Sequence, residues 1–101
     1  MKAFSGHEIE EALATLNDGK RTPWTCLEQK LHKEFRFANF VEAFGFMSQV
    51  ALIAEKANHH PAWFNVYRTV IVDLSTHDLA GVSEADFSLA SAIDAVAEQF
   101  G

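Results

Sequence analysis

The stretch Asn58-His59-His60-Pro61-Ala62-Trp63 stands between the longest helical pattern of the chain and its longest run of strand-forming residues. A proline restricts the residue before it to extended backbone, so His60 cannot continue the preceding helix. Two neighbouring imidazoles are therefore predicted to lie in a rigid corner of the fold, and the indole of Trp63 follows three residues after His60. We expect the rest of the chain to bring a third histidine, His77, to this corner.

Residues 40–56, upstream of the corner, are predicted to form the longest helix. Asn39 precedes them and Glu42 follows three residues later, which is the spacing of a capping box. The apolar side chains form two stripes, one through Phe40, Phe44, Met47, Ala51 and Ala54 and the other through Phe46, Val50 and Ile53. A helix that lies on a sheet needs only one such stripe. The second stripe therefore predicts contact with another subunit, and coverage by other helices of the same domain is the alternative.

Residues 63–74, downstream of the corner, are rich in Val, Ile, Phe and Tyr. As one strand they would extend about 40 Å at roughly 3.3 Å per residue, which is longer than a domain of this size is wide. A hairpin turn is therefore predicted near Arg68-Thr69, with a bulge as the alternative. Val70, Val72 and Leu74 would then share one face of the second strand, and Ile71, Asp73, Ser75 and His77 the other.

The remaining helices and strands are predicted from helix-capping residues and from the alternation of apolar and polar residues. Ser5 and Glu8 have capping-box spacing, which predicts a first helix over about residues 6–16. Two short strands are expected at 24–27 and 34–37, the second beginning as early as Leu31, with a loop at Gln29, Lys30 and His32 between them. Residues 79–81 are predicted to form a loop.

A third helix is predicted to begin at Ser83-x-x-Asp86, with Phe87, Ala90, Ile93, Ala97 and Phe100 facing inward. The order is then α-β-β-α-β-β-α. Paired short strands favour antiparallel neighbours, so the fold class is predicted as α+β, a four-stranded antiparallel sheet with three helices packed on one face. A length of 101 residues predicts one domain over residues 1–101.

Charge and composition argue against several classes of partner and location. The formal net charge is −6, so the surface should repel a phosphate backbone, and no direct nucleic-acid binding is expected. No apolar stretch approaches the roughly 18 residues that span a bilayer, and the first residues lack the apolar region of a secretory signal. One cysteine, Cys26, cannot form an internal disulfide, which predicts a reducing compartment, the cytoplasm.

Three imidazoles near neutral pH can both donate and accept protons, which makes acid–base catalysis the leading chemical interpretation. Asp86 could accept a ring N–H and fix a tautomer, although its role in the cap explains it more simply. Three histidines and a carboxylate can also bind zinc or iron, but no HxH, HxxxH or HExxH spacing is present. A purely structural role, in which the histidine pair caps the helix, is the remaining alternative.

Other notable side chains have simpler explanations. Trp63 and Tyr67 could stack on a planar ligand, but core packing is the alternative and is the better interpretation for Tyr67. Cys26 is predicted to be a small buried hydrophobe, and His7 and His32 to be surface residues. The Phe-rich segment 44–47 is more typical of a core than of a ligand site.

The spacing of these residues resembles the pterin-4a-carbinolamine dehydratase family, also known in animals as dimerisation cofactors of a homeodomain transcription factor. The family pattern is matched by Glu55, three residues, His59-His60-Pro61, five residues, Tyr67, nine residues, His77, eight residues and Asp86. Segments 44–47, 63–67 and 74–77 are also similar to the family. The resemblance covers about residues 24–97.

The resemblance implies a hydro-lyase that converts 4a-hydroxytetrahydrobiopterin to quinonoid dihydropterin and water, in recycling the pterin of aromatic amino acid hydroxylases. It implies no cofactor and no metal, since the reduced pterin is the substrate. By analogy, His59 and His77 would be the general acid and base, and His60 would mainly position the substrate. Glu55 and Asp86 would support the site. The other residues implied to contact the pterin are Asn58, Pro61, Trp63, Ser75, Thr76 and Asp78.

The family also implies a saddle-like sheet and homodimers or homotetramers, which agrees with the second apolar stripe of residues 40–56. An alternative function is therefore an oligomeric, coactivator-like interaction module that recruits a protein through Phe46, Val50 and Ile53. Nothing in the sequence names a transcription-factor partner.

Overall fold

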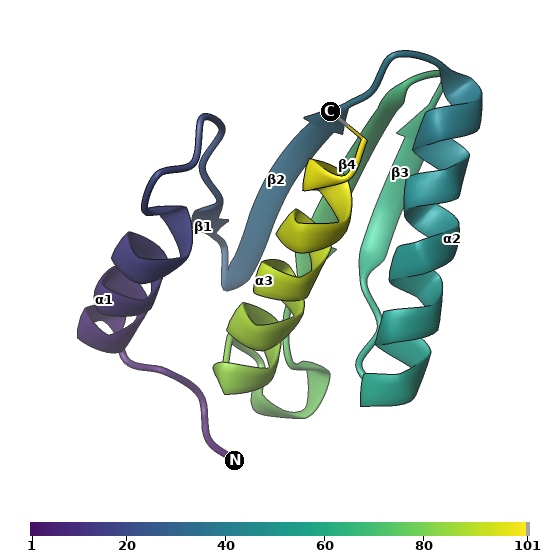
Figure 1. Ribbon diagram of the computed structural model, residues 1–101. Helices are drawn as coiled ribbons and strands as arrows, with labels where there is room; N and C mark the ends of the chain where they lie inside the picture. The colour runs from purple at the N-terminus through teal and green to yellow at the C-terminus, as the bar shows by residue number, and fades with distance from the viewer. Residues whose placement is uncertain (101) are drawn as a thin grey trace.

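The computed structural model describes residues 1–100, and Figure 1 shows their path. Its elements have the predicted order α-β-β-α-β-β-α with one added 3-10 turn, which confirms the α+β fold class. They are α1 (Gly6–Asn17), β1 (Thr25–Leu27), β2 (Lys30–Arg36), α2 (Phe40–Ala57), β3 (Ala62–Val66), β4 (Thr69–Leu74), η1 (His77–Leu79) and α3 (Glu84–Glu98).

The four strands form one antiparallel sheet in the order β1-β2-β4-β3. The predicted hairpin is confirmed, because β3 and β4 pair with Val66 opposite Thr69. Tyr67 takes a positive φ of 51° in the turn and is 61% exposed, so its predicted core position is wrong. A residue in a two-residue turn points its side chain away from the sheet that the turn connects.

The loop predicted at Gln29, Lys30 and His32 is confirmed for Gln29 and wrong for Lys30 and His32, because β2 begins at Lys30. Only Glu28 and Gln29 form the turn, both with positive φ. Along β2, exposed and buried residues alternate, with His32 on the exposed face and Leu31 on the buried one. The polar side chains on the exposed face give the start of this strand the composition of a loop.

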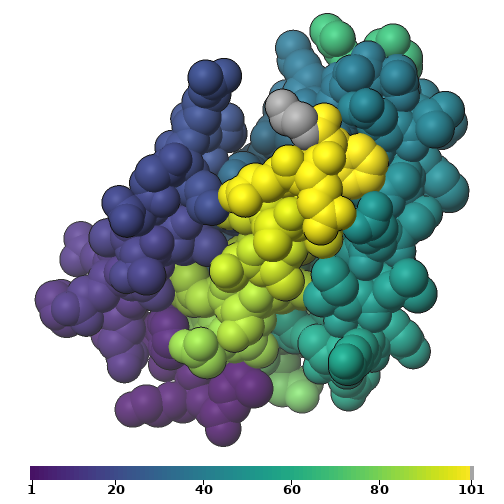
Figure 2. All heavy atoms as spheres, viewed as in Figure 1, coloured from purple at the N-terminus to yellow at the C-terminus, as the bar shows by residue number. Residues whose placement is uncertain are grey.

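The helices cover one face of the sheet. Figure 1 shows α2 and α3 side by side in front of the strands, and α1 beside α3 at the β1 edge. The space-filling view in Figure 2 shows α2 and α3 in contact along this side. Within residues 1–100 no helix covers the opposite face of the sheet, where Phe64 and Val66 are exposed.

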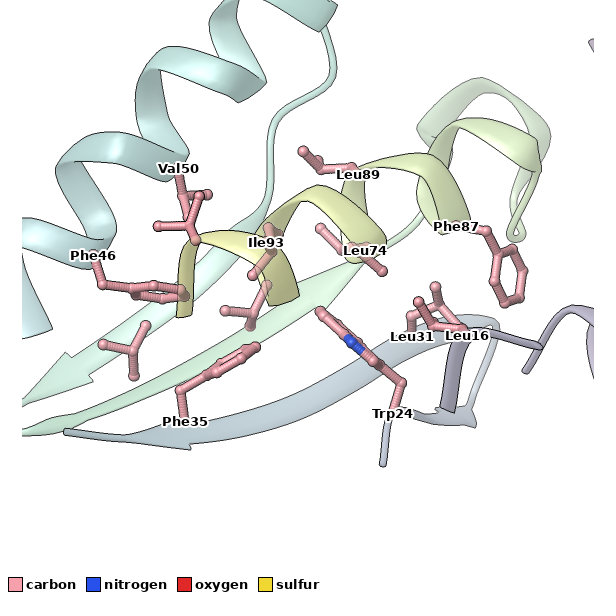
Figure 3. Packing of buried hydrophobic residues seen from close by; sticks show 14 of the residues in the cluster. Leu16, Trp24, Leu31, Phe35, Phe46, Val50, Leu74, Phe87, Leu89 and Ile93 are labelled. Atoms are coloured by element: carbon pink, nitrogen blue, oxygen red, sulfur yellow. The ribbon is translucent and has the colours of Figure 1, made fainter. Parts of the chain in front are cut away.

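The core lies between the helices and the sheet, as Figure 3 shows. Phe35 of β2 contacts the rings of Trp24 and Phe46, with centroids 5.9 and 4.9 Å away. Ile93 and the other predicted inward residues of α3 are buried or packed against the core, which confirms that prediction. Cys26 is partly buried and packs against the same cluster.

Helix α2 buries the stripe predicted to face another subunit, and Met47 and Ala54 of the first predicted stripe also pack toward the core. Phe46 and Val50 are fully buried against the sheet, and Ile53 is packed against the core. The prediction that these three residues face another subunit is therefore wrong. Both stripes have the same helical period, so only packing against the sheet selects between them.

The exposed apolar residues of α2, termed here its outer stripe, differ in part from the first predicted stripe. Its large apolar members are Phe40, Val41, Phe44 and Leu52, with Phe44 59% and Leu52 74% exposed. No helix among residues 1–100 is both long enough and apolar enough to cross a membrane.

Candidate active site

The histidine corner begins with the left-handed cap of α2. Asn58 has φ 53° and ψ 43°, a conformation that few residues other than glycine and asparagine adopt readily. The N–H groups of Asn58 and His59 donate to the Glu55 and Ala54 carbonyls, each at 3.1 Å. This cap reverses the chain and places the histidine pair between α2 and β3.

His59 is paired with a buried carboxylate. Its Nε2 lies 2.6 Å from Oδ1 of Asp86 in the first turn of α3. The His59 side chain is 17% exposed and that of Asp86 is 0% exposed. A carboxylate without a proton can only accept, so Nε2–H donates to it and Nδ1 remains free in the neutral ring. This contact joins residues 27 positions apart.

The second carboxylate oxygen of Asp86 has two other donors. Oδ2 accepts from the Thr76 hydroxyl at 2.7 Å and from the Ser83 N–H at 2.9 Å. The Thr76 and Ser83 hydroxyl oxygens are 2.6 Å apart. Asp86 therefore acts both in the cap of α3 and as the partner of His59, where the sequence offered these roles as alternatives.

His60 has a different environment from its neighbour. Its Nε2 lies 2.8 Å from Oε1 of Glu55, and both side chains are largely exposed. An exposed pair of this kind contributes about 0–1 kcal/mol to stability. His60 and Glu55 therefore form a solvent-facing pair at the corner.

His77 lies on a short turn that is tied to the same network. It begins η1 and is exposed, and Thr76 directly precedes it. The Thr76 N–H donates to the Gly81 carbonyl at 2.8 Å, which closes the base of the turn. Asp86 thus contacts His59 through one oxygen and the residue next to His77 through the other.

The other residues predicted to contact the substrate differ in their exposure to solvent. Pro61, Trp63 and Ser75 are half-buried, and Asn58 and Asp78 are exposed. Trp63 pairs opposite Val72 and its indole packs against the core, so core packing explains much of the position of this side chain. The Thr76 hydroxyl points into the Asp86 network.

Three hollows of the molecule lie away from the histidine corner. One of about 840 Å³ lies between the loop 19–22, β2 and the end of α3, and two of about 560 and 300 Å³ lie between α1 and α3. None of the three is lined by His59, His60 or His77. Among the residues that the structure describes, no three His, Cys, Asp or Glu side chains are grouped to hold a metal ion.

Two polar groupings were missed from the sequence. The spacing of Ser83 and Asp86 predicts only a helix cap, and the contact of the Ser83 hydroxyl with Thr76 has no local signal. Lys33 is buried on the inner face of β2 and pairs with Asp94 at 2.9 Å. The sequence does carry a signal for the burial of Lys33, because it lies between Leu31 and Phe35 on the inward-facing side of an alternating strand.

Fold and site together define a class of protein: a small α+β protein whose helix-covered sheet carries a histidine corner backed by a buried aspartate. A sequence model of the family described as pterin 4 alpha carbinolamine dehydratase matches residues 2–96. The chain belongs to this family, whose dehydratases are hydro-lyases.

Individual relatives agree with this assignment. A protein of Solibacter usitatus, provisionally named pterin-4-alpha-carbinolamine dehydratase, is 50% identical over 94 residues, covering 93% of this chain and 94% of its own. One from Prochlorococcus marinus strain MIT 9303, with the same provisional name, is 58% identical over 71 residues, covering 70% and 74%.

Solved structures also match. A Brucella melitensis protein described as a transcriptional coactivator/pterin dehydratase has a TM-score of 0.87 and 42% identity, covering 95% of this chain and 99% of its own. A pterin dehydratase-like protein described as a RuBisCO assembly factor in the alpha-carboxysome has a TM-score of 0.64 at 22% identity, covering 78% and 92%, and shares the fold.

Proposed function

We propose that this protein dehydrates 4a-hydroxytetrahydrobiopterin to quinonoid dihydropterin and water, by acid–base catalysis, in tetrahydrobiopterin recycling. The observation that carries the proposal is the pairing of His59 with buried Asp86 at 2.6 Å, which leaves the other ring nitrogen, Nδ1, available for proton exchange. Membership of the family supplies the substrate class.

The reaction needs two proton transfers and no electron transfer. A proton donor at the 4a oxygen allows the hydroxyl to leave as water, and a base removes the proton from N5 as the C4a–N5 double bond forms. Imidazoles can perform both steps near neutral pH. We assign them to His59 and His77, with His60 positioning the substrate and exchanging protons with solvent.

The supporting roles follow the geometry of the corner. Asp86 orients His59, and Glu55 pairs with His60 at the rim. Asn58, Pro61, Trp63, Ser75, Thr76 and Asp78 are proposed to line the substrate site. No cofactor is proposed, since the reaction changes neither oxidation state nor carbon skeleton, and the lone Cys26 supports a cytoplasmic location.

The test is the loss of carbinolamine absorbance with purified protein. His59→Ala and His77→Ala should each lower kcat by about 10² or more, the range that general acid–base catalysis contributes. His32→Ala is the matched control, because His32 is exposed on the open sheet face and pairs with Asp73, so its rate should not change. Wild-type protein that dehydrates the carbinolamine no faster than buffer would reject the proposed function.

A second candidate function is self-association, or recruitment of another protein, through the outer stripe of α2. The exposed Phe44 and Leu52 favour it, and the description of the Brucella protein as a coactivator is consistent with it. We propose a homodimer or homotetramer that buries this stripe, with no transcription-factor partner assigned.

Phe44→Glu and Leu52→Glu should shift sedimentation of the assembly toward the monomer. Gln49→Glu is the control, since Gln49 is exposed on the same helix outside the stripe. An assembly that survives both stripe substitutions would show that α2 does not form the interface.

A further inference from the structure

The Thr76 hydroxyl donates to the carboxylate that holds His59, and the Ser83 hydroxyl lies 2.6 Å from that of Thr76. We propose that these two hydroxyls, termed here the hydroxyl clamp, position Asp86 and so fix which nitrogen of His59 carries the proton. The inference rests on the proposed function, which it deepens by assigning two positioning residues that do not touch the substrate with their hydroxyls.

The clamp is a buried network with short distances. Ser83 and Asp86 are fully buried and Thr76 is half-buried. Three donors surround the carboxylate: the His59 ring at 2.6 Å, the Thr76 hydroxyl at 2.7 Å and the Ser83 N–H at 2.9 Å. A carboxylate held by three donors cannot rotate without losing hydrogen bonds that buried groups need.

The direction of each hydroxyl proton follows from counting donors. Thr76 has one hydroxyl proton, and it goes to Oδ2 of Asp86. Ser83 must therefore be the donor in its 2.6 Å contact with the Thr76 oxygen. Its other neighbour, the Met1 sulfur at 3.0 Å, is the weaker acceptor. The hydroxyl protons thus run from Ser83 to Thr76 to Asp86.

The result at His59 is a defined tautomer. With Oδ2 occupied by Thr76 and Ser83, Oδ1 is left for the ring N–H at Nε2. The free Nδ1 is then the atom that can exchange a proton with a ligand in the corner. Loss of the Thr76 hydroxyl would leave the Ser83 N–H as the one donor to Oδ2, so the carboxylate could turn more easily and would constrain the ring less.

The clamp also connects the two proposed proton-transfer residues. Thr76 donates its hydroxyl proton toward Asp86 and His59, while its carbonyl accepts from Leu79 N–H at 3.0 Å in the turn that carries His77. The Thr76 N–H donates to the Gly81 carbonyl. Thr76 therefore contacts Asp86, the partner of His59, and also stabilises the turn in which His77 lies.

The experiment compares Thr76→Val with Thr76→Ser. Valine keeps the branched shape without the hydroxyl, and serine keeps the hydroxyl. The ¹⁵N shifts of the His59 ring report the tautomer by NMR, and steady-state kinetics give kcat and KM. We expect mixed tautomers and a kcat lower by about 10- to 100-fold in Thr76→Val, the range found for partners that orient ligand imidazoles, with little change in KM and rescue by Thr76→Ser.

Ser83→Ala provides a second test if Thr76→Val does not fold, and Ser88→Ala is its control because Ser88 is exposed on the same helix. A single Nε2–H tautomer and wild-type kcat in the folded Thr76→Val or Ser83→Ala protein would overturn the clamp. Equal losses in Thr76→Val and Thr76→Ser would overturn it as well. If the wild type is not a dehydratase, mixed tautomers in Thr76→Val still support the clamp, so the two failures are distinguishable.

Discussion

At the residue scale, burial changes what a single side chain does. Asp86 has the spacing of a helix cap, and it does accept the Ser83 N–H. Its complete burial and the nearby His59 ring turn the same carboxylate into the partner of an imidazole. The spacing of Ser83 and Asp86 predicts the cap, while the contact with His59 depends on how α3 packs beside the corner.

Cys26 provides a pH-dependent prediction at this scale. Burial raises the pKa of the Cys26 thiol above its ordinary value of 9.0, and the negative charge of Asp86 adds to the effect. The thiolate is thus less favoured in the folded than in the unfolded chain. The protonated Cys26 thiol therefore contributes fully to the free energy of unfolding below the ordinary thiol pKa. This contribution is lost as the pH rises through the higher pKa of the folded state.

At about pH 8, iodoacetamide should therefore alkylate folded Cys26 several-fold more slowly than the urea-unfolded chain, because the thiolate is the reactive form. Mass spectrometry over time measures both rates, and Cys26→Ser is the blank. Equal rates in the folded and unfolded protein would contradict the raised pKa.

At the element scale, one buried ion pair connects the sheet to α3. Lys33 of β2 pairs with Asp94 of α3, and the Trp24 indole N–H donates to both oxygens of Asp94 at 3.1 Å. The Lys33 ammonium also lies 4.9 Å from the Phe35 ring centroid. The alternation of β2 predicts the direction of Lys33, but nothing local pairs it with a residue 61 positions away.

Asp94→Ala should lower the free energy of unfolding by about 3–5 kcal/mol, because it leaves the Lys33 charge buried without its partner. Urea denaturation followed by fluorescence measures the loss. The more exposed pair Lys20–Glu98, at 2.8 Å compared with 2.9 Å for Lys33–Asp94, is the matched control, and Glu98→Ala should shift the urea midpoint far less than Asp94→Ala. Similar losses in the two variants would show that burial does not determine the effect.

At the scale of the whole molecule, the position of α2 over the sheet decides which apolar residues form the core. Phe46 contacts the rings of Phe35 and Phe37, with centroids 4.9 and 4.7 Å away. Phe44, two residues earlier, points to solvent beside Phe40. Two phenylalanines separated by one glycine therefore have opposite roles.

Phe46→Ala should destabilise the monomer by about 3–5 kcal/mol, because it removes a ring from a closely packed core. Phe44→Ala should change monomer stability by only about 0.5 kcal/mol, as surface substitutions usually do. Urea unfolding at a concentration where sedimentation shows only monomer compares the two. A larger loss in Phe44→Ala would mean that the buried stripe of α2 is assigned incorrectly.

The sequence by itself determined the order of the elements, the hairpin near Arg68, the caps and the family, because each depends on residues near one another or on fixed spacings along the chain. The structure alone decided which stripe of α2 is buried, that Lys33 meets Asp94, and that Asp86 joins His59 to the turn before His77. These contacts link residues far apart in the chain, and they form only when helices and sheet pack together and desolvate the groups between them.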